Sequence, residues 1–319
     1  MTKSRRSRLG IGALMIGIPA AAAAMAAGQA LASPAQAPLH IKPRSSRIAY
    51  GRDLVVTGSE SAWDAGHTVV LQFARRGAAA WSQLGSATVN GAGAFQLAAR
   101  LEQSGLVRVL DASSGSLTPF VAHARGAGSG GAATSSAVPV NVAARVHVPS
   151  RGFDVNAGQA VQVRGRVLPA VGGRKVSLQS LQSGSWHTLA TARTGSAGRF
   201  VLRYVAGSAG QQSMRVRFAG DRLNEGSTTR AGQMNVFRAA EASWYNDGGN
   251  TACGFHAGNG VANRTLPCGT KVVFRYGGRT VTATVDDRGP YVGGRDWDLN
   301  QTTAGALGFG GVGQVWSSQ

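Results

Sequence analysis

Hydrophobic and polar residues alternate in short runs along most of the chain, for example at residues 69–73 and 175–179. An alternation with a period of two is typical of β-strands that bury one face. Glycine-rich segments at 90–93 and 194–198 follow such runs, and glycine supplies the positive φ that tight hairpins need. About seven such strands in roughly a hundred residues predict antiparallel β-sandwiches.

This pattern occurs twice. Four residues of the first copy recur between 105 and 107 positions later: Gly58, Gln72, Trp81 and Phe95 return as Gly165, Gln179, Trp186 and Phe200. We interpret this as a tandem duplication, with sandwiches at 33–124 and 138–238 and a glycine- and serine-rich linker at 125–137. The recurrence of Trp81 and Trp186 favours a core position for both over sugar stacking. The two modules resemble bacterial immunoglobulin-like β-sandwiches.

The first residues predict export. A basic opening that includes Arg5 and Arg6 precedes an apolar stretch and the sequence Ala30-Leu31-Ala32, which is typical of a cleavage site. We therefore predict a signal peptide at 1–32 and a secreted, extracellular or wall-associated protein, with an uncleaved N-terminal anchor as the alternative. The arginine pair leaves the twin-arginine route open beside the ordinary secretory route. No later apolar run approaches the roughly 20 residues of a membrane-spanning helix, so stable membrane insertion after cleavage is not expected.

Charge is distributed unevenly. The chain has 33 Lys and Arg against 14 Asp and Glu, a formal net charge of +19, yet residues 240–319 hold six basic and six acidic residues. The excess at 33–239 predicts binding to an anionic wall polymer and not to nucleic acid, which an exported protein does not meet. The alternative is that these arginines only form the solvent-exposed faces of strands and bind no polymer. The 46 glycines and the charged fraction of 15% exclude a coiled coil or a long helical bundle.

No cofactor is expected. Four histidines of the sandwiches are scattered through the sequence without Cys or carboxylate partners at ligand spacing: His67, His123, His147 and His187. We therefore predict no metal site. The sequence also contains no phosphate-binding loop and no dinucleotide fingerprint after a strand.

The last eighty residues differ from the sandwiches in their sequence pattern. Residues 271–276 and 279–285 alternate as strands around two glycines, which predicts a hairpin. Residues 298–307 are predicted to form one short helix, with Asn300 as its N-cap and Gly308 as its stop.

The only two cysteines of the chain, Cys253 and Cys268, also lie in this segment. In an exported protein, a disulfide is the expected pairing. Zinc binding by the pair is not expected, because only His256 is nearby and zinc needs four donors.

Several motifs of this segment occur together. They are Ala242-Ser243-Trp244-Tyr245, Thr251-Ala252-Cys253-Gly254, the run from Gly260 to Val272, Asp287-Arg288-Gly289-Pro290-Tyr291 and Gly294-Arg295-Asp296-Trp297-Asp298-Leu299. In this combination, residues 240–319 resemble the rare lipoprotein A (RlpA) family, to which expansins are distantly similar. The resemblance implies a six-stranded double-psi β-barrel, peptidoglycan glycan strands as the substrate and, for some members, lytic transglycosylase activity. The expected fold class is all-β: two tandem immunoglobulin-like sandwiches followed by this barrel.

A lytic transglycosylase can use one carboxyl group, first as acid and then as base. We choose Asp287, because its strand parity with Val285 places it on the apolar side, where desolvation favours a protonated carboxyl, and places Asp286 on the other face. The aspartate of the family's D-R-G-P motif also aligns with Asp287. The alternative for Asp287 is a turn aspartate that accepts backbone amides or pairs with Arg288 or Arg295.

Further site residues follow from the resemblance. Asp298 aligns with the aspartate of the family's G-R-x-x-D-L motif and is the second catalytic candidate, although its place before the predicted helix also suits an N-terminal acceptor. The predicted substrate-binding residues are Tyr245, Asn263, Arg288, Tyr291 and Arg295. The aromatic residues Tyr245, Tyr291 and Trp244 either stack on sugars or belong to the core.

Two positions depart from the family. Catalytic members usually carry a histidine two residues before the T-L-P motif, where this chain has Asn263, and an acidic residue where it has Phe255. Asn263 cannot titrate, so proton transfer would rest on Asp287, with Asp298 or the otherwise exposed His256 as helpers. The leading prediction is a secreted cell-wall protein whose barrel binds peptidoglycan strands and cleaves them to 1,6-anhydro products. The alternative is a non-catalytic, expansin-like binder that loosens the wall.

Overall fold

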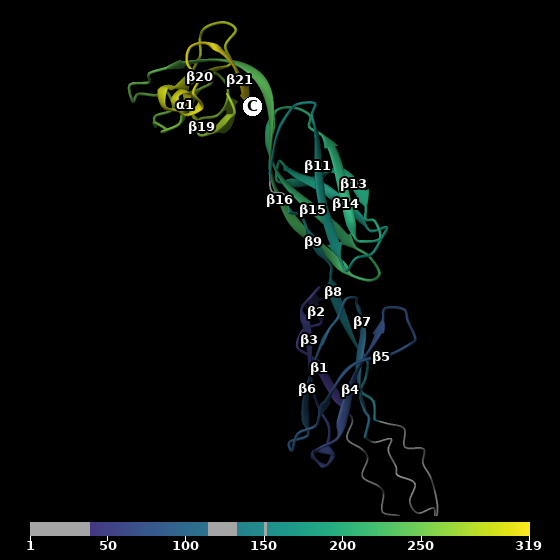
Figure 1. Ribbon diagram of the computed structural model, residues 1–319. Helices are drawn as coiled ribbons and strands as arrows, with labels where there is room; N and C mark the ends of the chain where they lie inside the picture. Colours follow the sequence, from purple (N-terminus) through teal and green to yellow (C-terminus); the bar gives the residue numbers. More distant parts are fainter. Residues whose placement is uncertain (1–38, 114–132, 150–151) are drawn as a thin grey trace, which may run out of the picture. The chain divides into compact units, whose positions relative to one another are not determined.

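The computed structural model describes residues 39–113, 133–149 and 152–319. The predicted signal peptide at 1–32 and most of the linker predicted at 125–137 lie outside these ranges. Within them the regular structure is almost entirely β-strand, as predicted, with one α-helix (Figure 1). None of the described helices has the length and apolar character that crossing a membrane requires.

The N-terminal unit consists of two sheets around one core. Its elements are β1 (His40–Pro43), β2 (Arg47–Ala49), β3 (Asp53–Ser59), the 3-10 turn η1 (Ala62–Asp64), β4 (Thr68–Arg75), β5 (Ser82–Thr88), β6 (Ala94–Arg100), β7 (Gly105–Asp111) and β8 (Val138–Ala143). One sheet has the order β1-β3-β6; the other has the order β5-β4-β7-β8, with β2 parallel to β8. Alternate residues of β4 (Val69, Leu71 and Phe73) enter the core between the sheets, as the period of two predicts.

The next unit repeats this arrangement. Its strands are β9 (Arg145–His147), β10 (Phe153–Asn156), β11 (Ala160–Leu168), β12 (Lys175–Gln182), β13 (Ser185–Arg193), β14 (Arg199–Val205), β15 (Gly210–Gly220) and β16 (Glu225–Tyr245). One sheet has the order β9-β11-β14; the other has the order β13-β12-β15-β16, with β10 parallel to β16. Each strand has a counterpart with the same partners in the first unit, which is the relationship that a tandem duplication produces.

The recurring glycines and phenylalanines face one another across strands. Gly58 pairs with Phe95, and a Cβ on Gly58 would lie 2.2 Å from the Phe95 ring. In the second unit Gly165 pairs with Phe200, and a Cβ there would lie 2.4 Å from that ring. Both rings are buried, so glycine recurs because the phenylalanine ring occupies the space of a side chain.

The recurring tryptophans lie outside the described hydrophobic cores, so the predicted core position is wrong. The Arg108 guanidinium lies 4.1 Å from the centroid of the half-buried Trp81 ring, and the Arg215 guanidinium lies 4.0 Å from that of Trp186. Each arginine also donates to the recurring glutamine, Gln72 or Gln179, at 2.8 Å. A cation over an aromatic face is favourable, and this contact accounts for the tryptophans in both copies.

The C-terminal domain is a closed barrel of six strands. The C-terminal part of β16 pairs with β21 (Gly313–Ser317) and β20 (Trp297–Asn300), and the ring is completed by β17 (Gly260–Ala262), β19 (Arg279–Asp287) and β18 (Lys271–Tyr276). The strand order β16-β20-β17-β19-β18-β21 returns to β16, so the sheet has no free edge. β18 and β19 form the predicted hairpin. Core side chains include Phe274 and Trp297, whose rings pack edge to face.

The helix and the disulfide of this domain were both expected. α1 spans Gln301–Leu307, with Asn300 as its N-cap and Gly308 as its left-handed C-cap. The helix begins three residues later than predicted, because Asp298 and its neighbours pair with β16 and β17 as a strand. Cys253 and Cys268 form the predicted disulfide.

Candidate functional site

The two predicted catalytic aspartates lie in one row across the barrel wall. Asp287 of β19 and Asp298 of β20 are both cross-strand partners of Ala262 in β17. Ser243 of β16 is the partner on the other side of Asp298. Directly paired residues of neighbouring strands point to the same face, so these side chains share one face of the wall, opposite to core residues such as Leu299. Two strand spacings separate the backbones of the aspartates, which is about 10 Å.

Asp287 is half-buried and is held by three hydrogen-bond donors. The Tyr245 hydroxyl donates to Oδ2 at 2.8 Å, and the backbone amides of Ala252 and Arg288 donate to Oδ1 at 2.8 Å each. Burial, this hydrogen bond and the nearby carboxylates raise the pKa of Tyr245 above its ordinary value, so its hydroxyl remains a donor at neutral pH. The two amide bonds match the turn role that the sequence left open for Asp287, and the tyrosine adds a side chain that orients the carboxylate.

The neighbouring Asp286 is the fully buried carboxylate of the pair. Its oxygens accept the backbone amides of Ala257 at 2.8 Å and Val261 at 3.1 Å. Burial raises the pKa of Asp286 above its ordinary value, although both amide bonds oppose the shift. Asp286 therefore organises the loop before β17 from inside the domain.

The prediction that strand parity places Asp287 on the apolar side, with Val285, is wrong. The register between β17 and β19 shifts by one residue, so Val261 pairs with Val285 while the next residue, Ala262, pairs with Asp287. Such a bulge adds one residue to one strand and breaks the alternation of faces. As a result Asp286 follows Val285 into the interior, and Asp287 lies at the half-buried face.

A second series of hydrogen-bonded polar side chains starts at Asp298. The Ser243 hydroxyl donates to Asp298 Oδ1 at 2.7 Å, and Arg295 Nη1 donates to the same hydroxyl oxygen at 3.0 Å. Asp298 lies within β20, and the helix N-cap is Asn300. The alternative role of Asp298 as a helix-terminal acceptor is therefore wrong.

Comparisons with known proteins concern this same domain. Residues 238–316 match a family model described as "Lytic transglycolase". Over 105 residues the chain is 40% identical to "Probable endolytic peptidoglycan transglycosylase RlpA" of Synechocystis sp. (strain ATCC 27184 / PCC 6803 / Kazusa). The C-terminal domain is an RlpA-like double-psi β-barrel. The matched part is 26% of this chain and 32% of that relative, so the likeness does not extend over the whole of either protein.

In this RlpA-like barrel, two predicted substrate-binding residues support one loop. Asn263 Oδ1 accepts the backbone amides of Thr265 at 3.0 Å and Leu266 at 2.8 Å, which closes the turn after β17. Arg288 Nη1 donates to the carbonyl oxygens of Asn263 at 3.1 Å and Leu266 at 3.0 Å. The oxygen of the amide at the family's histidine position is thus engaged by the protein itself.

The aromatic residues near the RlpA-like motifs differ in exposure. The side chain of Tyr291 is 83% exposed and that of Trp244 is 43% exposed, so the core alternative is wrong for both. Tyr245 is half-buried, with its hydroxyl on Asp287. Tyr291 and Trp244 remain available for stacking on a ligand.

Sequence reasoning missed Asp247. Its Oδ2 lies 2.8 Å from His256 Nε2 and accepts Asn300 Nδ2 at 3.2 Å. Burial opposes ionisation, but hydrogen bonds from the Gly249 amide, Asn300 and His256 hold the pKa of Asp247 below its ordinary value. His256 is exposed, as expected, but it is paired with Asp247 and not alone. The signal available in the sequence was an aspartate followed by two glycines.

Proposed function

We propose that the barrel binds peptidoglycan glycan strands and cleaves them as a lytic transglycosylase, in an exported cell-wall protein. The placement of Asp287 carries the proposal: Tyr245 and two backbone amides fix its carboxylate on the outer face of the barrel wall. The position between Asp287 and Asp298 is the small residue Ala262. Ala262 is itself buried, so access of a sugar ring to both carboxylates is part of the proposal.

The proposed reaction breaks the bond from C1 of one sugar to the O4 of the next and gives that oxygen a proton. The 6-hydroxyl of the same sugar then bonds to C1 and releases its proton, so no water is consumed. One carboxyl group can donate the first proton and accept the second, and Asp287 is that group. Tyr245 orients it. Asp298, which accepts a hydrogen bond from Ser243, supplies negative charge that stabilises the oxocarbenium-like transition state.

The variant Asp287→Asn tests this mechanism. The full chain is incubated with peptide-free glycan strands, and the products are identified by mass spectrometry. We expect 1,6-anhydro ends from the wild type and a rate lower by about 100-fold or more in Asp287→Asn, because the proton donor is lost. Asp296→Asn is the matched control, since that carboxylate of the same domain pairs with Arg238. An unchanged rate in Asp287→Asn would reject the mechanism.

A non-catalytic, expansin-like binder is the second candidate. It is favoured by Asn263, whose side-chain oxygen serves the adjoining turn where catalytic family members carry a histidine, and by Phe255 at the acidic position. Such a barrel would hold glycan strands and leave them intact. Co-sedimentation of the full chain with strands, without any anhydro product, would favour this candidate.

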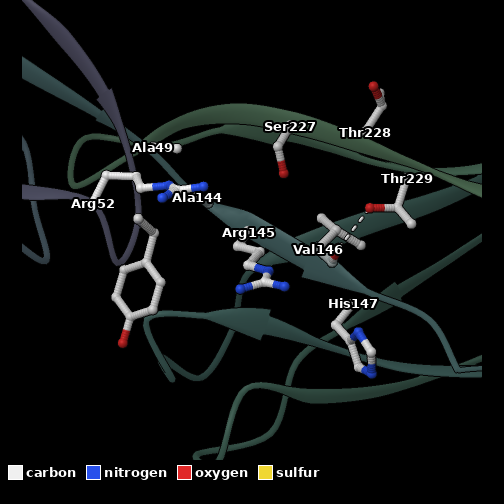
Figure 2. A pocket seen from close by; sticks show the side chains of 10 residues that line it. Ala49, Arg52, Ala144, Arg145, Val146, His147, Ser227, Thr228 and Thr229 are labelled. Atoms are coloured by element: carbon white, nitrogen blue, oxygen red, sulfur yellow. Dashed lines mark hydrogen bonds between the residues drawn. The ribbon is translucent and has the colours of Figure 1, made fainter.

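The sandwiches are proposed to hold the protein to anionic wall polymers. The excess of basic residues lies outside the neutral barrel segment. A pocket of about 490 Å³ is lined by Arg52, Arg145 and His147 together with hydroxyl groups such as that of Thr229, and its lining includes no acidic residue (Figure 2). Positive side chains around a hollow attract polyanions.

Salt dependence tests this second role. Binding of the full chain to purified wall teichoic acid should weaken about tenfold between roughly 0.05 M and 0.5 M salt, because salt screens exposed charges. The double variant Arg52→Gln with Arg145→Gln should bind more weakly at low salt and depend less on salt. Tight binding that salt does not change would contradict an electrostatic role.

A further inference from the structure

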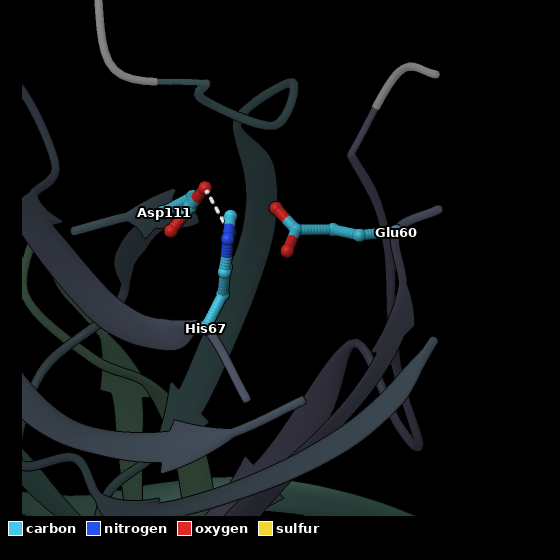
Figure 3. Close-up of side chains that lie close together, drawn as sticks. All are labelled: Glu60, His67 and Asp111. Carbon is cyan, nitrogen blue, oxygen red and sulfur yellow. Dashed lines mark hydrogen bonds and ion pairs between the residues drawn. The ribbon is translucent and has the colours of Figure 1, made fainter. Parts of the chain in front are cut away.

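One corner of the first sandwich gathers three metal-binding side chains that are far apart in the sequence. Glu60 follows β3, His67 precedes β4 and Asp111 ends β7. One potential ligand atom of each lies within 4.8 Å of the other two. Figure 3 shows the carboxyl groups of Glu60 and Asp111 directed toward the His67 ring. The expectation that His67 has no carboxylate partner is therefore wrong.

This corner carries an excess of negative groups. His67 Nδ1 lies 3.1 Å from Asp111 Oδ2 and 3.9 Å from Asp64 Oδ1, and the Asp111 side chain is only 3% exposed. Glu60 Oε2 is shielded from solvent and has no hydrogen-bond partner among the described residues. Burial and the charges of Asp111 and Asp64 raise the pKa of Glu60 to about 7, although His67 opposes the shift. A cation would give the shielded oxygen the partner that a buried polar atom needs.

The second sandwich fills the same corner with a cation of its own. The offset of 107 residues that relates the repeats here places Arg174 at the position of His67. The Arg174 guanidinium is buried, and its Nε lies 3.1 Å from Asp221 Oδ2. The positions of Glu60, Asp64 and Asp111 hold the apolar residues Val167, Val171 and Phe218. Where one repeat has an arginine paired with one carboxylate, the other has an imidazole beside three carboxylates.

We propose that Glu60, His67 and Asp111 bind one divalent transition-metal ion. Carboxylate oxygens and an imidazole nitrogen together suit zinc and its neighbours in the first transition row. Zinc bonds to such atoms are about 2.0–2.2 Å long, so the three side chains close inward by about an ångström on binding. Asp64 or water completes the coordination. Because β3 belongs to one sheet and β4 and β7 to the other, the ion joins the two sheets of this sandwich.

Calorimetric titration of the metal-stripped full chain with ZnCl₂ tests the site. We expect one ion per chain with micromolar affinity, and affinity lower by about 10- to 100-fold in Glu60→Gln or His67→Ala. His256→Ala is the matched control, because it removes the histidine that Asp247 pairs with in the barrel. With CoCl₂ the wild type should show a ligand-field absorption band that His67→Ala lacks.

Hydrogen exchange of the wild type keeps the test independent of how the variants fold. Zinc should slow amide exchange in β3, β4 and β7 and leave the corresponding strands β11, β12 and β15 unchanged. The absence of saturable zinc binding by the wild type would overturn the proposal. So would affinity unchanged in both Glu60→Gln and His67→Ala, or protection confined to other parts of the chain.

Discussion

The sandwiches occur in duplicate and the barrel occurs once, and this difference separates packing residues from chemical ones. In the sandwiches, the recurring residues prove to be packing units: a glycine against a phenylalanine ring, and an arginine held between a glutamine and a tryptophan. One position that differs between the copies, His67 in the first and Arg174 in the second, lies at the corner where their chemistry differs. The barrel has no second copy to compare with. Asp286 and Asp287 are therefore distinguished only by the residues around each of them.

The largest stability effect is expected at the corner where the repeats differ. Arg174→Met should lower the free energy of unfolding of the second sandwich by about 3 kcal/mol, because Asp221 loses its cation in a mostly buried setting. Arg215→Met is the control, since loss of a more exposed guanidinium over Trp186 should cost about 1 kcal/mol or less. Urea unfolding followed by segment-resolved hydrogen exchange measures both. Equal losses would contradict the distinction between the two arginines.

Loss of the disulfide should affect only the single-copy barrel. The double variant Cys253→Ser with Cys268→Ser frees a loop of 15 residues, and we expect a loss of about 3 kcal/mol in the stability of the barrel. Differential scanning calorimetry should show its transition at a lower temperature and the sandwich transitions unmoved. Reductant should reproduce the shift in the wild type and have no effect on the variant.

A smaller effect tests whether recurrence marks packing. Gly165→Ala should destabilise the second sandwich by about 1–3 kcal/mol, because the new methyl group overlaps the Phe200 ring and the His147 carbonyl oxygen. Gly207→Ala is the matched control, since nothing lies within 4 Å of a Cβ at Gly207. Thermal unfolding compares the two variants. If Gly165→Ala were as harmless as the control, the packing account of the recurring glycine would be wrong.

Much of the fold could be predicted because its signals are local. Alternation around two glycines predicts the β18–β19 hairpin, and Gly308 predicts the end of α1, each from neighbouring residues. The helix start was wrong because Asp298 pairs with β16 and β17, partners that are distant in the sequence. The positions of Trp81 and Trp186 were wrong for the same reason, since each covering arginine comes from a strand later in the chain.

For the candidate site, the sequence motifs nominate residues but do not predict their surroundings. The motif nominates Asp287. Which of the two adjacent carboxylates is buried, however, is decided by the register shift between β17 and β19, and no residue of β19 predicts that shift. His67 and Asp111 are 44 residues apart and meet only because β4 and β7 pair in the same sheet. The contacts of both sites thus depend on strand pairing between residues far apart in the sequence, which a local pattern does not predict.

Isotope labelling tests the central claim most directly. The full chain is incubated with peptide-free glycan strands in water enriched in ¹⁸O, and the products are weighed by mass spectrometry. The account predicts 1,6-anhydro ends without ¹⁸O, because the attacking oxygen is the 6-hydroxyl of the sugar. New reducing ends that carry ¹⁸O, or strands that stay bound and uncut, would contradict it.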